Sequence, residues 1–190
     1  MGKQVYLRKI RALFEKSPVV DFKSIRRIVG TDYAKLLVLN LFKKGEIKKL
    51  GKGFYTKHNE NSLAVFYYAP AYIGLQSAIT FYKLWDQATL PVIITTKKTR
   101  RGVRKILDSN ILVRNISKRY FFGFKYLQDH NFFLPYSDIE KTLIDMVVFN
   151  QKIEKDVLKN IKKKINLKLL NNYLKKYPDN IVKRVTNLLA

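Results

Sequence analysis

The first 30 residues are divided into two amphipathic helices by residues that end or begin helices. Apolar residues recur at helical spacing over residues 3–16, and Ser17-Pro18 predicts the end of that helix. Asp21 is placed to cap a second helix, and Gly30 is a suitable residue to follow its last turn. Two short helices in close succession strongly limit the folds open to this part of the chain.

A third helix and a hairpin complete the pattern. Thr31 or Asp32 is expected to cap a helix that runs to about Lys44. The segment GEIKKLGKGFYT then predicts two short strands that are joined by a tight turn at residues 51–53. Three helices followed by a two-stranded wing, with a glycine-containing turn between the inner helices, is the order of a winged helix-turn-helix.

Residues 57–62 are polar and predict a linker, so we expect two domains, residues 1–60 and residues 61–190. The second is expected to be a mixed α/β domain that ends in helices, which makes the whole chain α+β. Its expected elements are an aromatic strand ended by Pro70, a helix over Tyr72–Lys83, a buried strand in TLPVIITT, strands over 111–116, 120–127 and 132–134, a helix begun by the capping box Ser137–Glu140, and two or three helices over 152–190 broken at Pro178.

Positive charge is the dominant feature of the composition. Lys and Arg number 38 and Asp and Glu 14, a net charge of +24. A charge this large favours a polyanionic partner, although a lysine-rich composition alone is the alternative explanation. Residues 1–60 carry 15 basic and 5 acidic side chains, a net of +10, so +14 of the +24 lies outside the first domain.

The sequence lacks the residues and motifs on which several classes of function depend. The chain has no cysteine, which excludes disulfides, cysteine-type zinc sites and thiol catalysis. His58 and His130 are isolated, and no phosphate-binding or nucleophile-elbow motif occurs. We therefore expect no enzyme activity, no cofactor and no metal. There is no apolar stretch of membrane-spanning length and no signal peptide, so we expect a cytoplasmic protein without a membrane partner.

The third helix is the predicted element for contact with base edges in the major groove. Phosphate contacts are expected from the second helix, the end of the third helix and the wing. The predicted DNA-binding residues are Arg26, Arg27, Thr31, Tyr33, Lys35, Lys43, Lys44, Lys48, Lys49 and Lys52. The alternative for the lysines is an ordinary solvated face.

Tyr33, Leu36 and Leu39 make this helix apolar on nearly all sides. We favour packing of Leu36 or Leu39 against the second domain or a second subunit, and in the second case the protein would be a homodimer. Contact with thymine methyl groups is the alternative.

A second basic segment, TKKTRRGVRK, follows the predicted buried strand. As a loop it is a candidate surface for nucleic acid or another partner, because arginine suits bidentate phosphate contact. An ordinary exposed loop is the alternative. Its candidate residues are Lys97, Lys98, Arg100, Arg101, Arg104 and Lys105.

Three ordered motifs resemble the AbiEi-type antitoxins of abortive-infection systems, which are described as transcriptional regulators of viral defence. They are the winged helix that ends in LFKKGEIKKLGKGFYT, the segment YIGLQSAITFYKLW with the basic TTKKTRRG after it, and SDIEKTLIDMVVF. Where the family has a histidine in the second motif this chain has Lys83 or its neighbours, and Ile139 replaces a proline before Glu140.

The resemblance implies a protein that binds an inverted repeat in double-stranded promoter DNA and represses its own operon. It also implies a second domain that opposes a nucleotidyltransferase-like toxin without a stable complex. Lys141 and Asp145 match family positions, and we interpret them as a structural i,i+4 ion pair. Asp145 on an apolar helix is the acid most suited to a buried partner. A non-specific architectural or RNA-associated protein is the alternative function.

Overall fold

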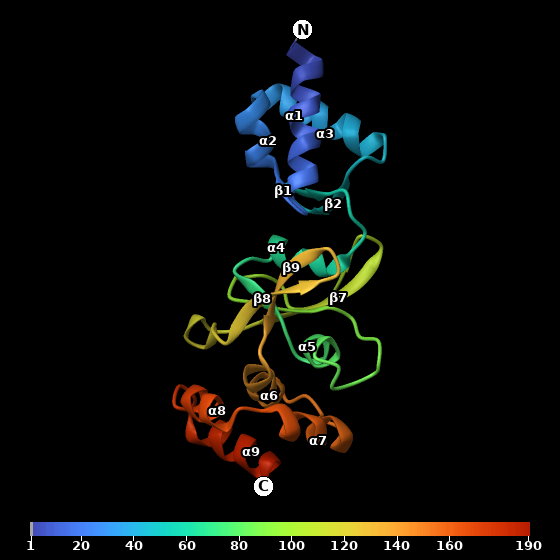
Figure 1. The fold of residues 1–190 in the computed structure, drawn as a ribbon. Helices are drawn as coiled ribbons and strands as arrows, with labels where there is room; N and C mark the ends of the chain where they lie inside the picture. The colour runs from blue at the N-terminus through green and yellow to red at the C-terminus, as the bar shows by residue number, and fades with distance from the viewer. Residues whose placement is uncertain (1) are drawn as a thin grey trace. The chain divides into compact units, whose positions relative to one another are not determined.

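The computed structural model describes residues 2–190, with side chains from Gln4 onward. It confirms the mixed α+β class that the sequence predicts. The chain divides into two compact units, and Figure 1 follows them from blue to red. The first unit comprises residues up to Tyr67 together with 105–110, and the second comprises residues 68–104 and 111–190.

The first unit consists of short helices and one small sheet. Its elements are α1 (Gly2–Lys16), β1 (Val20–Asp21), α2 (Phe22–Val29), α3 (Thr31–Lys43), β2 (Lys48–Gly51), β3 (Phe54–Thr56), a 3-10 helix (Asn61–Leu63) and α4 (Ala64–Tyr67). The sheet has the order β1-β3-β2, with both pairings antiparallel. Strand β1, which the sequence does not indicate, pairs through Val20 with Tyr55 and through Asp21 with Phe54.

Apolar faces of α1, α2 and α3 meet in the core of this unit. Ile10 and Phe14 of α1 are buried with Ile25 of α2, and Ile47 before β2 closes the cluster. From α3 the core receives four side chains at helical spacing: Ala34, Leu37, Val38 and Leu41. The periodicity in the sequence therefore identifies the correct inner faces.

The second unit is built on a mixed six-stranded sheet with the order β6-β7-β5-β4-β9-β8. The strands are β4 (Ala71–Ile73), β5 (Val92–Thr95), β6 (Gly102–Ile106), β7 (Ser109–Asn115), β8 (Phe124–Asp129) and β9 (Phe132–Ser137). Strand β4 is antiparallel to β5 and parallel to β9, and β5 is parallel to β7. A short 3-10 helix (Lys118–Tyr120) precedes β8.

The helices of this unit share one hydrophobic core with the sheet. They are α5 (Gln76–Phe81), α6 (Ile139–Val148), α7 (Lys155–Lys164), α8 (Leu167–Leu174) and α9 (Asp179–Leu189). Tyr72 and Ile94 face each other on neighbouring strands and are buried with Leu143 and Ile144 of α6. Figure 1 shows α6 next to the C-terminal helices, whose Val157, Leu170 and Val185 complete the same core.

Two predicted elements at the start of the second domain are wrong. The aromatic run before Pro70 forms α4 and a turn with a cis Ala69–Pro70 peptide, and the strand begins after the proline, at Ala71. The helix predicted from Tyr72 begins only at Gln76, because Tyr72 and Ile73 pair with β5. A short apolar run is compatible with either a strand or a helix, and only pairing decides between them.

The predicted capping box at the start of α6 is also wrong in its residues. Asp138 is the N-cap, and its carboxylate accepts a hydrogen bond from the backbone N–H of Lys141 at 2.7 Å. Ser137 still belongs to β9, and its hydroxyl contacts that of Thr142 at 2.7 Å. Glu140 instead accepts a hydrogen bond from the backbone N–H of Asn166 at 2.6 Å, which ties α6 to the start of α8.

Candidate nucleic-acid interface

A single residue, Gly30, joins α2 to α3. Its N–H donates to the carbonyl of Arg26 at 2.9 Å, and its own carbonyl accepts from the N–H of Ala34 at 3.1 Å. Its φ of +82° is strained for any residue with a side chain, so glycine suits this position. The expectation that Thr31 or Asp32 caps α3 is wrong, because the N-cap is Gly30 and Thr31 is already helical.

Asp21 begins α2 as the sequence predicts. Its carboxylate accepts a hydrogen bond from the N–H of Ser24 at 2.6 Å. Its backbone also pairs with Phe54 in the sheet, so one residue fixes both the start of α2 and the position of the hairpin. Asp21 and Gly30 together hold α3 against α2 with little freedom at the connection.

The outer face of α3 carries most of the predicted base-contacting residues. Thr31 and Lys35 are exposed, and the side chain of Lys35 lies 3.9 Å from Asp32 in a solvated ion pair. Tyr33 is half-buried, with its ring centroid 6.0 Å from that of Tyr6 on α1. The structure thus places Tyr33 beside α1, whereas Thr31 and Lys35 face solvent.

Three large apolar side chains also lie on the outer face of α3. Leu36 is 51% exposed, Leu39 48% and Phe42 51%. The sequence pattern draws attention to the two leucines but not to Phe42. Helix α3 therefore presents apolar surface on the side opposite to the core as well as toward it.

Basic side chains flank this apolar surface. Arg26 and Arg27 are exposed in the last turn of α2, and Lys43 and Lys44 are exposed at the end of α3. On the hairpin, Lys49 and the turn residue Lys52 are exposed.

Lys48 differs from the other hairpin lysines, because its ammonium donates to the side-chain carbonyl of Asn59.

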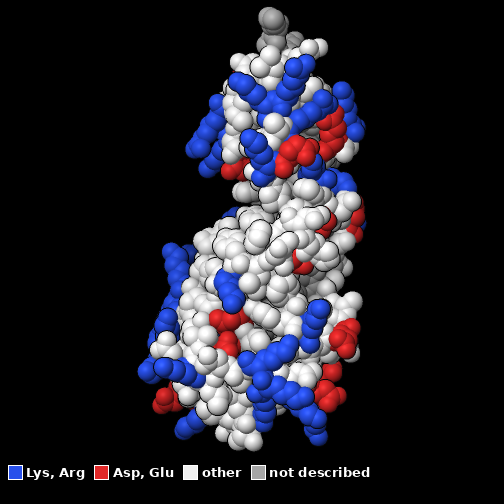
Figure 2. Space-filling model, viewed as in Figure 1, with Lys and Arg blue, Asp and Glu red and all other residues white. Residues whose placement is uncertain are grey.

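Several acidic side chains of the first unit are already engaged with cations. Arg11 forms a two-pronged contact with Glu46 at 2.7 and 2.9 Å, and this hydrogen bonding lowers the pKa of the Glu46 carboxyl. Glu15 lies 2.5 Å from Lys57. The lysines and arginines around α3 therefore keep most of their charge unpaired, and Figure 2 shows basic side chains over much of this unit.

The second basic segment is only partly a loop. Lys97, Lys98, Arg100 and Arg101 are exposed after β5, but β6 begins at Gly102, so the expectation of a loop through Lys105 is wrong. The guanidinium of Arg104 donates to the carbonyls of Arg100 and Arg101, both at 3.0 Å. Arg104 therefore holds the loop in shape.

The last residue of that segment, Lys105, lies on β6. Its ammonium is 3.6 Å from Asp108 in an exposed ion pair.

A further basic surface lies on α7, where the sequence pattern singles out only residues 162–164. Among residues 2–190, no ion pair involves a lysine of this helix. Figure 2 shows basic side chains gathered on the second unit as well. The exposed lysines of α7 are Lys155, Lys159, Lys162, Lys163 and Lys164.

The predicted ion pair between Lys141 and Asp145 is confirmed, and both side chains are fully buried. The hydroxyl of Tyr72 donates to the other carboxylate oxygen of Asp145 at 2.7 Å. The Lys141 ammonium also lies over the rings of Tyr72, Phe122 and Tyr177, at 5.4, 5.5 and 6.0 Å. Burial raises the pKa of Asp145 and lowers that of Lys141, so each group needs the other to stay charged.

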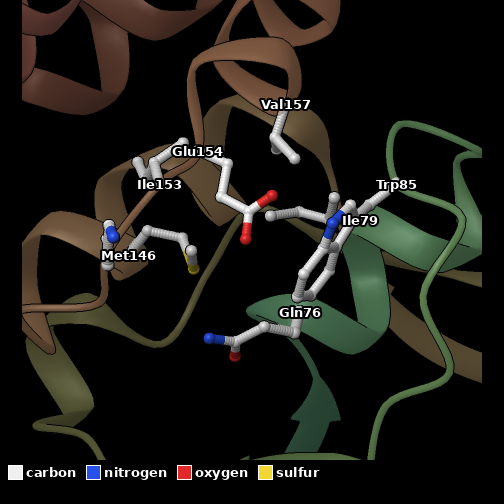
Figure 3. Close-up of a pocket in the computed structure, with 8 residues that line it drawn as sticks. Gln76, Ile79, Trp85, Met146, Ile153, Glu154 and Val157 are labelled. Carbon is white, nitrogen blue, oxygen red and sulfur yellow. The ribbon is translucent and has the colours of Figure 1, made fainter.

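One small pocket lies between α5 and the start of α7 (Figure 3). It is lined by Gln76, Ile79, Trp85, Met146 and Glu154 among others, and its volume is about 50 Å³. This pocket is therefore smaller than a usual small-molecule site, whose volume is ~300–1,000 Å³. Within the described chain, no group of three His, Asp or Glu side chains is placed to hold a metal ion, and no helix is long and apolar enough to cross a membrane.

Comparison with known proteins yields a similarity of fold. No family model and no curated protein matches the chain. A solved structure with a similar fold is that of the Rv2827c protein from Mycobacterium tuberculosis, with a TM-score of 0.66 and 14% sequence identity. The match covers 97% of this chain and 76% of that one, so the shared fold extends over both units.

Proposed function

We propose that the first unit is a winged helix-turn-helix that binds double-stranded DNA, and that the protein is a transcriptional regulator. The carrying observation is the outer face of α3, which is exposed and flanked by basic side chains from α2, the end of α3 and the hairpin turn. In this proposal α3 enters the major groove and β2–β3 is the wing. The backbone contacts come from the exposed lysines and arginines.

The decisive experiment measures duplex binding by the full chain as a function of salt. Each lost phosphate contact reduces the slope of log affinity against log salt by about 0.9. The variant Lys43→Gln/Lys44→Gln/Lys52→Gln should therefore flatten the slope by about 2.7 and weaken binding. A control that removes equal charge from exposed positions on α1, Arg8→Gln/Lys9→Gln/Lys16→Gln, should leave the slope close to that of the wild type. A salt-independent affinity would refute the proposal.

We further propose that the protein represses its own operon and acts as an antitoxin toward a nucleotidyltransferase-like toxin. The support is the resemblance of the wing, the 72–85 segment and the 137–149 helix to AbiEi-type antitoxins. Footprinting on the upstream DNA tests the first point, with a protected inverted repeat as the expected result. The triple lysine variant tests the second, because protection from the toxin should persist when DNA binding is lost.

A non-specific nucleic-acid protein is the second candidate function. It is favoured by the unpaired lysines of α7, which lie outside the first unit. Uniform coating of DNA in the footprint, with no protected repeat, would support this candidate over the regulator.

A further inference from the structure

Helix α3 is apolar on both of its faces, which is unusual for a helix at a protein surface. Its inner face buries four apolar side chains, while Leu36, Leu39 and Phe42 remain about half exposed on the outer face. A helix that is apolar all round is normally covered on every side. The outer face of α3 therefore has the composition of a surface that is covered in the working state.

The exposed side chains of α3 have a helical order that suits contact with a groove. Leu36, Leu39, Asn40 and Lys43 follow the i, i+3, i+4, i+7 spacing and so share one face of the helix. Asn40 and Lys43 are exposed, so the leucines lie beside an amide and a cation. The apolar surface is thus interrupted by one hydrogen-bonding group and one positive charge.

This combination matches the chemistry of A·T base pairs in the major groove. The thymine C5-methyl is the apolar group that base edges present there, and adenine presents the N7 acceptor and the N6 donor that an asparagine amide fits. We propose that Leu36 and Leu39 contact thymine methyl groups and that Asn40 contacts adenine, so that the protein prefers A·T-rich duplex DNA. This inference rests on the proposed DNA-binding function.

Charge favours DNA over a second copy of the chain as the occupant of this face. Residues 1–60 carry a net charge of +10, so two copies that met through α3 would bring like charges together. Asp32, the acid on α3, is paired with Lys35 on its own helix. A polyanion instead gains from the cations at both ends of the apolar surface.

The test compares the affinities of the full chain for three duplexes of equal length. They are an A·T-rich duplex, a G·C-rich duplex, and the A·T-rich duplex with every thymine replaced by uracil, which removes only the methyl groups. We expect the A·T-rich duplex to bind about tenfold more tightly than the G·C-rich one. Each methyl buried against a leucine contributes about fourfold, so uracil should weaken binding by at least that factor.

Leu36→Ala tests whether the methyl effect passes through this helix. Leucine and alanine are both strong helix formers, so the variant is expected to fold. It should bind the thymine duplex more weakly and the uracil duplex unchanged, which brings the thymine-to-uracil ratio toward one. Val5→Ala removes a similarly exposed apolar side chain from α1 and should leave the ratio at its wild-type value.

Each outcome has a definite meaning. Tight duplex binding with no loss on uracil substitution would overturn the methyl contact and leave the proposed function standing. Absence of duplex binding would overturn both. If Leu36→Ala turned a dimer into a monomer in sedimentation and left the thymine-to-uracil ratio unchanged, the apolar face would be a self-association surface and the inference would fail.

Discussion

Substitution of Asp145 by asparagine isolates the contribution of the buried charge network in the second unit. The change keeps the size of the side chain and an acceptor for the Tyr72 hydroxyl, which lies 2.7 Å from the carboxylate. It removes the negative charge that faces the Lys141 ammonium, and both side chains are fully buried. The ammonium would then keep the aromatic rings around it and the more distant charge of Asp138, but no ion-pair partner.

The expected cost follows from the imbalance that the substitution creates. Removing one partner of a buried ion pair typically costs about 3–5 kcal/mol. Three rings near the ammonium offset part of this, because a desolvated cation–π contact contributes about 2 kcal/mol. We therefore expect a loss near the lower limit, about 3 kcal/mol, which raises the unfolding equilibrium constant about 150-fold.

A double-mutant cycle separates the pair from its two members. Lys141→Met leaves the carboxylate unpaired and should cost a similar amount, about 3 kcal/mol. Lys141→Met/Asp145→Asn removes both charges, keeps the acceptor for the Tyr72 hydroxyl and should lie within about 1 kcal/mol of the wild type, because no uncompensated buried charge remains. The coupling between the two positions is then about 5–6 kcal/mol.

Urea unfolding followed by tryptophan fluorescence measures these stability differences in the second unit of the structure. The chain has one tryptophan, Trp85, and it packs against the core of the second unit. Its fluorescence therefore reports the unfolding of that unit separately from the first. Additive losses, with the double variant about 6 kcal/mol less stable than the wild type, would refute the buried-pair reasoning.

Three further predictions concern other parts of the molecule. Gly51→Ala places a Cβ 2.5 Å from ring atoms of Tyr67 and should cost about 1–3 kcal/mol by overpacking, seen as a lower melting temperature that Lys52→Ala does not share. Burial raises the pKa of Asp138, so the stability that its protonated form contributes is lost as the pH rises through the raised pKa. Asp138→Asn still caps α6 and does not titrate. Urea titrations should therefore show this variant gaining stability relative to the wild type over that rise in pH. Replacing exposed α7 lysines by glutamine should reduce the salt slope of duplex binding without changing its sequence preference, and an altered preference would contradict a backbone-only role; the positions are Lys159, Lys162 and Lys163.

The elements of the first unit are predictable because short-range signals determine them. Helical periodicity identifies the buried faces, and Asp21 and Gly30 mark the two ends of α2. The hairpin follows from glycines on both sides of Lys52. Strand β1 is missed because its two residues become a strand only through pairing with β3.

The second unit is less predictable because long-range contacts determine its elements. The side chain of Glu140 has the spacing of a capping residue, yet it binds the N–H of Asn166, 26 residues later. Tyr72 has helical neighbours in the sequence but pairs with Ile94 in the sheet. A local pattern cannot show which distant group Glu140 binds. It also cannot show whether the short apolar run at Tyr72 forms a strand or a helix, since Tyr72 is buried in either case.

The candidate site shows the same limit at the level of single side chains. Sequence position indicates that Arg104 belongs to a basic segment, but only the structure shows that its guanidinium binds the carbonyls of that segment. The apolar residues of α7 predict a packed helix. The sequence pattern therefore does not show that the lysines between them are exposed and form no ion pair. The sequence thus predicts which residues are basic, but it does not predict which groups they bind.

Burial of acidic side chains in the second unit makes its surface more basic than the composition suggests. Asp145 is buried against Lys141, Glu140 is buried against the N–H of Asn166, and Asp138 caps α6 while it accepts from Tyr173 at 2.8 Å. Asp145 and Glu140 are therefore removed from the surface and Asp138 is partly buried, whereas one lysine, Lys141, is buried with them. Because unpaired surface cations govern counterion release, duplex binding by the full chain should depend on salt more steeply than the first unit alone accounts for.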